Sequence, residues 1–211
     1  MVLAVIDYGS GNLKSVSQAL LKAVSQAGLR EEVIVTRNPS DLYLADRVVL
    51  PGVGAFGDCM LGLQGVPGMI DAIEEVTLNQ GKPFLGICVG MQLMADLGTE
   101  DGMHKGLSWI QGEVASLPRG DWKGPHMGWN NLRFLTDHTV FRGIPQNTDF
   151  YFVHSYHLRC EIGDHCLATT DYHVPICSIV GRDNILGVQF HPEKSQAQGI
   201  RFLTNFLLWR P

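Results

Sequence analysis

The sequence lacks the patterns that would direct it to a membrane or to a nucleic acid. Its apolar start at residues 2–6 has no cationic segment before it and is stopped by Asp7, so it is too short for a signal peptide or a membrane span. The 16 Lys and Arg residues are spread thinly along a chain of net charge −5, without the basic stripe of a nucleic-acid or anionic-membrane binder. We therefore expect a cytoplasmic protein that binds neither nucleic acid nor membrane.

Paired cysteines and a complete nucleotide fingerprint are also missing. The five cysteines are an odd number without a CxxC pair, which argues against a disulfide framework or a zinc site. The turn GSGN at residues 9–12 lacks the third glycine and the distal acidic residue of a dinucleotide site. We expect no metal and no cofactor. The cysteines expected to be ordinary packed thiols are Cys59, Cys160, Cys166 and Cys177.

What is present indicates one globular α/β domain, residues 1–211. The chain is 45% hydrophobic and 18% charged, which is typical of a compact protein, and it contains no repeat or linker that would divide it. The first half alternates apolar runs with amphipathic stretches, the pattern of βαβ units around a parallel sheet. The predicted strands are 2–6, 33–36, 48–50 and 84–87, and the predicted helices are 13–27 and a second one that follows the loop 51–57 and ends near residue 80.

The second half has shorter alternating runs separated by Gly, Pro and Asn. These predict antiparallel or mixed strands added to the parallel core. The run 185–190 is continuous and apolar, so we expect it to be a buried strand, and a closing helix is expected at 197–209. The other strands expected here are 112–117, 150–157, 166–170 and 175–180.

Cys88 stands where the strand 84–87 breaks into the turn GICVG at residues 86–90. A tight hairpin from strand to helix needs small residues on both sides of its apex, and it pushes one side chain out at the carboxyl end of the sheet. The start of the following helix favours a thiolate there. The segment therefore predicts a nucleophile elbow whose sulfur attacks a carbonyl.

A base for this thiol is expected at His191. Among eight histidines, His191 is the one that directly follows an apolar strand, and the carboxyl edge of a parallel sheet is where active sites assemble. Glu193, held by the stiff Pro192, can accept from the imidazole and orient it. Cys88, His191 and Glu193 are the predicted catalytic triad.

Attack on a carboxamide produces an oxyanion, which needs N–H donors already in place. The backbone of Val89, directly after the nucleophile, is the first candidate. The loop PGVG at residues 51–54 leaves the neighbouring strand at the same edge and provides a second donor from Gly52 or Val53. Gln92 lies one helical turn beyond Cys88, so it is expected to line the substrate pocket.

These motifs resemble the class I (triad) glutamine amidotransferases and, more narrowly, the glutaminase subunits of imidazole glycerol phosphate synthase. Val89 stands where leucine is commoner, and residues 96–109 match the family pattern only loosely, so their role stays open. The blocks that carry the resemblance are DYGSGNL (7–13), PGVGAF (51–56), GICVGMQ (86–92), PHMGWN (125–130), FVHSY (152–156) and FHPEKS (190–195).

The resemblance implies a flavodoxin-like, doubly wound, mostly parallel sheet flanked by helices, with antiparallel strands added in the C-terminal half. It implies hydrolysis of glutamine through a thioester, and delivery of the ammonia to a separate (β/α)₈ cyclase subunit in histidine biosynthesis, the two chains forming a heterodimer. It places the oxyanion hole at Val53 and Val89. The implied glutamine contacts are Gly52, Gln92 and the backbone of His154, Ser155 and Tyr156. The implied partner contacts are Tyr8, Asn12, His126, Trp129, Tyr151 and Lys194.

The sequence leaves two other interpretations open. The chain is alternatively a glutaminase for another synthase, such as the anthranilate or pyridoxal phosphate systems, or a cysteine hydrolase that acts alone. It is alternatively a silent binding module that uses the elbow fold only to hold a partner. Blocks 7–12 and 126–130 disfavour the first interpretation, and the intact triad disfavours the second.

Overall fold

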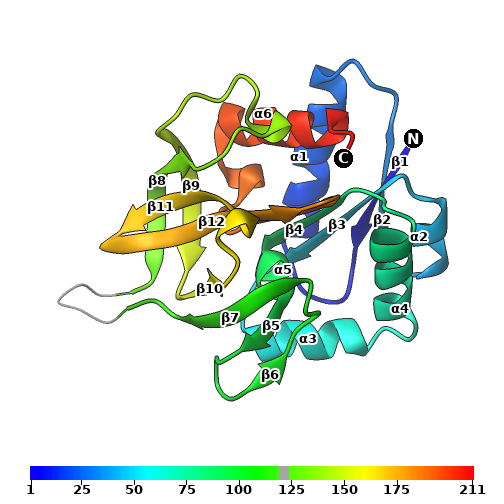
Figure 1. Cartoon of the computed structure of the whole chain (residues 1–211). Helices are drawn as coiled ribbons and strands as arrows, with labels where there is room; N and C mark the ends of the chain where they lie inside the picture. The colour runs from blue at the N-terminus through cyan, green and yellow to red at the C-terminus, as the bar shows by residue number, and fades with distance from the viewer. Residues whose placement is uncertain (119–123) are drawn as a thin grey trace.

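A nine-stranded sheet organises the computed structural model of this protein, which describes residues 1–118 and 124–211 (Figure 1). Its strand order is β2-β1-β3-β4-β13-β12-β11-β8-β9. The first five strands in this order are parallel, and every later neighbour is antiparallel. The parallel strands are β1 (Val2–Ile6), β2 (Glu32–Thr36), β3 (Arg47–Gly52), β4 (Phe84–Cys88) and β13 (Ile185–Val188). The antiparallel strands are β12 (Val174–Arg182), β11 (Cys166–Tyr172), β8 (His126–Phe134) and β9 (Thr148–His154).

The parallel half has the flavodoxin-like order 2-1-3-4-5, so the α/β fold class predicted from the sequence is confirmed. Strands β1, β3, β4 and β13 are buried along nearly their whole length. Such strands read as continuous apolar runs because helices cover both faces of the sheet. Their carboxyl ends therefore meet at one edge of the molecule.

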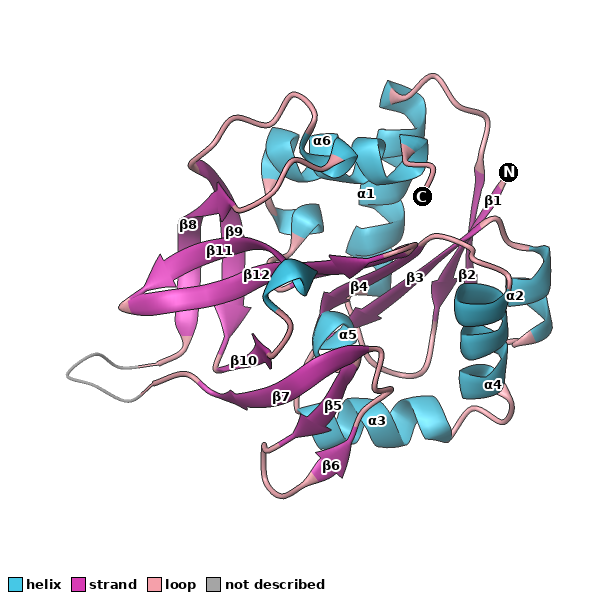
Figure 2. Cartoon of the chain, viewed as in Figure 1, coloured by secondary structure: helices cyan, strands magenta, loops and turns pink. Residues whose placement is uncertain are grey.

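The helices fall into two groups on opposite sides of this sheet (Figures 1 and 2). On one side α1 packs against α6, and the buried stripe of α1 consists of Val16, Ala19, Leu20, Ala23 and Val24. On the other side lie α2, α3 and α4. The helix bounds are α1 (Leu13–Gln26), α2 (Ser40–Leu44), α3 (Phe56–Gln64), α4 (Met69–Glu74), α5 (Val89–Gln92) and α6 (Gln196–Leu208). Short helical turns are η1 (Glu75–Asn79), η2 (Thr139–Phe141), η3 (Gly163–His165) and η4 (Pro192–Lys194).

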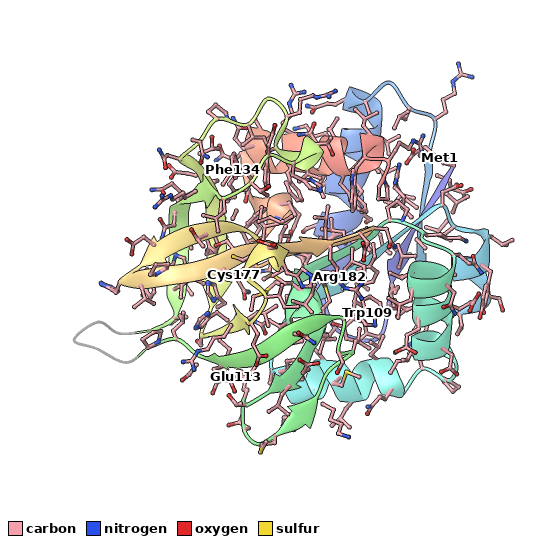
Figure 3. All side chains as sticks on the ribbon, in the orientation of Figure 1. Met1, Trp109, Glu113, Phe134, Cys177 and Arg182 are labelled. Atoms are coloured by element: carbon pink, nitrogen blue, oxygen red, sulfur yellow. The ribbon has the colours of Figure 1, made fainter. Side chains whose placement is uncertain are left out.

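A second, four-stranded sheet lies below the first in Figure 2 and has the order β10-β7-β5-β6. Arg182, at the end of β12, donates from Nε to the carbonyl of Trp109 at 2.7 Å and so joins the two sheets (Figure 3). Trp109 also packs edge-on against Phe84 of β4. The strands of the second sheet are β5 (Ala95–Gly98), β6 (His104–Lys105), β7 (Ile110–Ser116) and β10 (Tyr156–Cys160).

Two local predictions were wrong, and one predicted helix is present but short. The helix expected to end near residue 80 is broken between α3 and α4, where Pro67 and the left-handed Gly68 interrupt it. The run expected as one strand at 150–157 changes sheets at Ser155, between β9 and β10. The helix after Cys88 has only four residues and leads into β5, so its dipole is far weaker than that of a full helix.

Within the described ranges, none of the helices is long and apolar enough to cross a membrane.

Candidate active site

Cys88 occupies a sharp turn between β4 and α5 whose backbone is locked by its neighbours. Its φ of 55° and ψ of −112° are strained for a residue with a side chain. A Cβ on Gly86 would lie 2.5 Å from the carbonyl oxygen of Gly90, and a Cβ on Gly90 would lie 1.8 Å from the carbonyl oxygen of Leu50. Only glycine therefore fits on either side of the nucleophile, and the turn has little freedom to move.

The sheet brings Cys88 and His191 together. Gly52, the last residue of β3, is the direct register partner of Cys88, and β13, which ends just before His191, pairs with β4 on the other side. Cys88 is 4% exposed and His191 is 2% exposed. The two groups that the sequence predicted at the carboxyl edge therefore lie at the bottom of a hollow in that edge.

His191 is oriented by Glu193. Its Nδ1 lies 2.8 Å from Oε1 of Glu193, and both side chains are buried. The turn η4 begins with Pro192 and carries the glutamate back beneath the imidazole. The backbone of His191 is also tied down, because its N–H donates to the carbonyl of Tyr151 and its carbonyl accepts from Ser195 Oγ at 2.7 Å. The geometry leaves Nε2 of His191 without a hydrogen bond to any described residue.

The proton affinity of His191 differs from that of an ordinary buried histidine. Burial lowers its pKa, but the interactions with Cys88 and Glu193 outweigh burial and raise the pKa to about 9. His191 therefore carries a proton near neutral pH in this arrangement. A protonated imidazole next to the sulfur can stabilise a thiolate and donate to a leaving group.

A cavity of about 400 Å³ opens above Cys88, a volume suited to a small molecule. It is lined from several segments that are far apart in the sequence. Its lining residues are Val53, Gly54, Cys88, Val89, Gln92, Glu100, Pro125, Val153, His154, Ser155, Tyr156, His191 and Lys194.

The loop after β3 forms the opposite rim of this cavity and is held differently from the elbow. Val53 is 42% exposed, and its N–H donates to Ser10 Oγ at 3.2 Å. Ser10 in turn donates to the carbonyl of Val53 at 2.6 Å. One of the two predicted oxyanion donors is thus occupied by Ser10. Val89 is the first residue of α5, where backbone N–H groups have no partner within the helix.

The predicted glutamine contacts are mostly brought together. Gln92, His154, Ser155 and Tyr156 line the cavity with Cys88, because the change of sheets at Ser155 turns this segment towards the elbow. Gly52 does not line it: a Cβ there would lie 2.7 Å from the hydroxyl of Tyr8 and 2.8 Å from the backbone nitrogen of Gly90. Gly52 is needed for close packing behind the cavity.

The predicted partner contacts divide into surface and buried residues. Trp129 is 49% exposed and packs edge-on against Tyr151, with ring centroids 5.9 Å apart, and Lys194 Nζ lies 5.7 Å from the centre of the Tyr151 ring. The side chains of Tyr8 and His126 are only 2% and 3% exposed, and the partner contact expected of the loops that bear them stays a prediction. The remaining residue, Asn12, is half-buried before α1 and does not cap that helix.

Two residues of the site were not singled out from the sequence. Glu100 lines the cavity from the segment after β5 and accepts from the N–H of Phe56 at 2.9 Å. Gln189 is fully buried, and its Nε2 lies 3.8 Å from the sulfur of Cys88. The position of Gln189 two residues before His191, on the same side of an extended segment, was a signal for it. No comparable signal marked Glu100.

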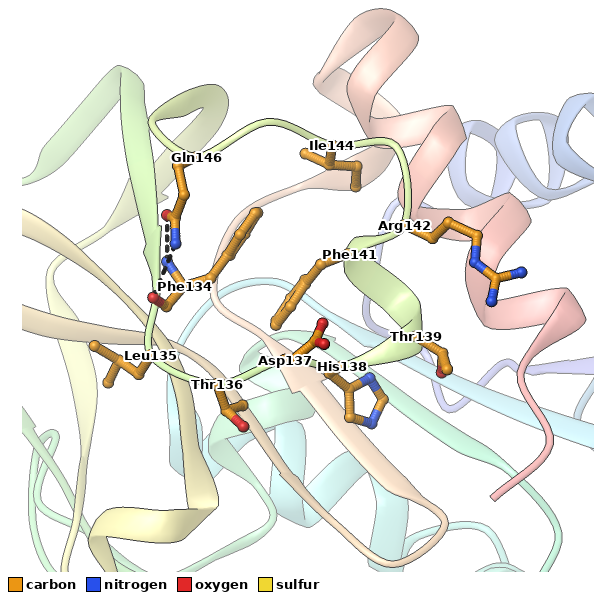
Figure 4. A pocket seen from close by; sticks show the side chains of 10 residues that line it. All are labelled: Phe134, Leu135, Thr136, Asp137, His138, Thr139, Phe141, Arg142, Ile144 and Gln146. Carbon is orange, nitrogen blue, oxygen red and sulfur yellow. Dashed lines mark hydrogen bonds between the residues drawn. The ribbon is translucent and has the colours of Figure 1, made fainter.

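A larger hollow of about 740 Å³ lies between the end of β8 and η2 (Figure 4). Phe134 and Phe141 stack in its wall with ring centroids 4.1 Å apart, and Gln146 is bonded to the backbone of Phe134. No cysteine is among its lining residues. Nothing in this hollow corresponds to the nucleophile and oriented base above Cys88. In the described part of the chain, no group of three or more His, Cys, Asp or Glu residues is arranged to hold a metal ion.

The fold and the site together define a class of protein. Residues 4–209 match the family model described as "Glutamine amidotransferase class-I". The chain belongs to the class I glutamine amidotransferase family, as its motifs had indicated.

Full-length relatives point to one branch of that family. The protein called "Imidazole glycerol phosphate synthase subunit HisH" of Rhodospirillum rubrum is 52% identical over 214 residues, with complete coverage of both chains. The protein of the same name from Zymomonas mobilis is 52% identical over 99% of this chain and 96% of its own length. The protein of the same name from Mesorhizobium japonicum is 48% identical with complete coverage.

Solved structures share the fold at much lower identity. A crystal structure of a protein described as a glutamine amidotransferase superposes with a TM-score of 0.72 at 17% identity, covering 99% of this chain and 98% of the other. A glutamine amidotransferase from Thermotoga maritima gives 0.61 at 18% identity, covering 92% of this chain and 76% of the other.

Proposed function

We propose that this chain is the glutaminase subunit of an imidazole glycerol phosphate synthase, acting in histidine biosynthesis. It hydrolyses glutamine to glutamate and ammonia, as a single catalytic domain. The observation that carries the proposal is that Cys88 and His191 line one cavity, and that His191 is bonded through Nδ1 to Glu193. The full-length relatives support the particular synthase.

The chemistry follows from the three side chains. The sulfur of Cys88 attacks the carboxamide carbon of glutamine, and His191 gives its proton to the nitrogen, so that the C–N bond breaks and ammonia leaves. The product on the protein is a glutamyl thioester. A water molecule, deprotonated by His191, then attacks the thioester carbon, and glutamate leaves as the C–S bond breaks. Glu193 keeps the imidazole oriented through both steps.

The walls of the cavity supply complementary groups for glutamine. Glu100 offers a carboxylate to the α-ammonium group, and Lys194 offers a cation to the α-carboxylate at the rim. Gln92 and the backbone at residues 154–156 hold the remaining polar atoms. An amide pocket with both charges matched would reject substrates that lack the amino-acid head group.

The oxyanion hole is complete only if the loop after β3 changes its conformation. Val89 N–H is available, but Val53 N–H is bonded to Ser10. We propose that docking of a ligand-loaded partner favours a conformation in which Val53 turns its N–H towards the cavity. Gly54 has a φ of 99°, and a Cβ added there would meet no atom within 4 Å, so this side of the loop is not packed against other segments.

A partner is also required by the chemistry of the product. Ammonia released into water near neutral pH becomes ammonium, which has no lone pair with which to attack an acceptor. We propose that the partner is a (β/α)₈ cyclase in a heterodimer, docked over the contacting side chains of Trp129, Tyr151 and Lys194. The five free thiols suit a reducing compartment, and we propose the cytoplasm.

The decisive experiment is a glutaminase assay of the purified chain under three conditions: alone, with the cyclase, and with the cyclase together with its own substrate. We expect a low rate alone and a large increase only in the complete mixture. Equal rates in all three conditions would contradict the assignment to a coupled synthase, although they would leave glutamine hydrolysis itself intact.

A further inference from the structure

A line of hydrogen bonds runs from strand β8 to the sulfur of Cys88, and its two histidines belong to no step of the mechanism above. His126 Nδ1 lies 2.9 Å from His154 Nε2. His154 Nδ1 lies 2.9 Å from the carbonyl oxygen of Tyr156. The other end of His126, Nε2, lies 3.1 Å from Nδ2 of Asn130.

Two backbone carbonyls decide which atom donates in each of these bonds. The carbonyl of Tyr156 can only accept, so His154 Nδ1 carries a proton and Nε2 accepts from His126. At the other end Asn130 Nδ2 donates to the carbonyl of Asp171 at 2.8 Å, so this nitrogen also donates to His126 Nε2. Both ends require the same neutral tautomer of His126, with the proton on Nδ1. Burial lowers the pKa of His126 to about 4 and that of His154 to about 3, which agrees with neutral rings.

The same carbonyl orients two glutamine side chains next to the nucleophile. Gln92 Nε2 donates to the carbonyl of Tyr156 at 2.9 Å and to Gln189 Oε1 at 3.0 Å. Because Gln189 Oε1 is thereby used as an acceptor, its Nε2 faces the sulfur of Cys88. The two lone pairs of the Tyr156 carbonyl are both used, one by His154 and one by Gln92. Loss of the histidine bond therefore removes one of the two side-chain donors that fix that carbonyl.

Strand β8 presents its two faces to different surroundings. Met127 and Trp129 are exposed on one face, and His126 and Asn130 lie on the other. His126 is held between Phe152 and Tyr172, with ring centroids 4.7 Å and 4.2 Å away. The strand that carries the proposed docking residue Trp129 thus also carries the first imidazole of the line.

We propose that His126 and His154 are positioning residues that hold the Tyr156 carbonyl, and through it the amides of Gln92 and Gln189, in the arrangement that binds glutamine over Cys88. The expected effect of these two histidines on glutamine kinetics rests on the proposed function, whereas their expected tautomers do not.

The test replaces His126 with phenylalanine, which keeps the ring stack but cannot donate to His154, and with asparagine, whose Nδ2 can replace the donor. In the full complex with the cyclase, we expect His126→Phe to raise the KM for glutamine about 10- to 100-fold with a smaller change in kcat. Synthesis from ammonium salt should not change. His126→Asn should recover most of the loss. His138→Phe is the matched control, since His138 stacks on Phe141 and Trp209 outside this line, and it should leave the KM unchanged.

Equal KM values for His126→Phe and wild type, or equal losses in His126→Phe and His126→Asn, would overturn the proposal. Nitrogen NMR of the imidazoles in the isolated chain gives an independent measurement. Both rings should be neutral and protonated at Nδ1, and any other tautomer at either ring contradicts the line. If the wild-type complex hydrolysed no glutamine, the proposed function would fail. The NMR result alone would then decide whether the hydrogen bonds through His126 and His154 exist as described.

Discussion

The two sides of the cavity above Cys88, the elbow and the loop after β3, differ in how tightly their backbones are packed. On the elbow side, Gly86 and Gly90 are pressed against backbone atoms and a strained φ holds the nucleophile in place. On the loop side, Val53 is 42% exposed, a Cβ added to Gly54 would meet no atom within 4 Å, and a serine from another loop occupies the N–H proposed as an oxyanion donor. The thiol and its base are therefore assembled in advance, whereas one of the two proposed oxyanion donors is bonded elsewhere. We propose that this difference allows a partner to control the rate without rearranging the nucleophile.

Removing the sulfur should have the largest effect on the assembled side. We expect Cys88→Ala to reduce glutamine-dependent synthesis about 1000-fold or more, because no nucleophile remains. Synthesis from added ammonium salt should persist, since we propose that the acceptor site lies on the partner. The measurement is the coupled assay with each nitrogen source. Loss of both activities would indicate that Cys88 is needed for assembly of the complex.

A pair of glycine substitutions tests the contrast in packing directly. A Cβ at position 90 would lie 1.8 Å from the Leu50 carbonyl oxygen, so Gly90→Ala should lower the free energy of unfolding by more than about 4 kcal/mol or prevent folding. Gly54→Ala meets no atom within 4 Å but must adopt a φ of 99°, which costs about 1–2 kcal/mol. Urea unfolding of both variants measures the difference. Similar destabilisation in the two would refute the contrast.

The pH dependence of stability should separate the two histidine environments. The folded-state pKa of His191 is raised to about 9, so its contribution is complete below about pH 6.5 and is lost as the pH rises through 9. His126, His154 and His157 have folded-state pKa values lowered by burial, so their contribution is complete above about pH 6.5 and is lost as the pH falls towards 4. Urea midpoints between pH 4 and 10 should therefore peak near pH 6.5.

One variant tests whether His191 causes the loss of stability at alkaline pH. His191→Gln should remove the loss between pH 6.5 and 9 while leaving the acid loss in place. An unchanged alkaline profile would show that another group is responsible.

The smallest effect is expected on the loop side. Ser10→Ala removes the oxygen that holds Val53 N–H, so the rate of the chain without its partner should rise about three- to tenfold, and the stimulation by the loaded partner should shrink. Ser17→Ala, at a half-buried serine whose hydroxyl is bonded within α1, is the control. If the partner-free rate of Ser10→Ala equals that of the control, the Ser10 bond does not restrain the loop.

The sequence predicted those parts of the site whose determinants are adjacent along the chain. The glycines of the elbow directly flank its cysteine and follow the strand before it, and only Pro192 separates His191 from Glu193. The parallel sheet followed from buried apolar runs separated by helices, whereas its flavodoxin-like arrangement was implied by the family resemblance. Elements whose bounds depend on distant contacts were predicted less well. The run 150–157 is an example, because its first part pairs with β8 and the part after Ser155 pairs with β7 in the other sheet.

The amino-acid sequence by itself determined the chemistry: a thiol at a tight turn, a histidine and a carboxylate at fixed spacing, and the family to which they belong. Only the tertiary structure decided how these groups are surrounded. It buried Tyr8 and His126, paired Val53 with Ser10, and brought Gln189 to the sulfur of Cys88. The reason is that a turn is set by local backbone sterics, whereas burial and hydrogen-bond partners depend on which distant segments pack together.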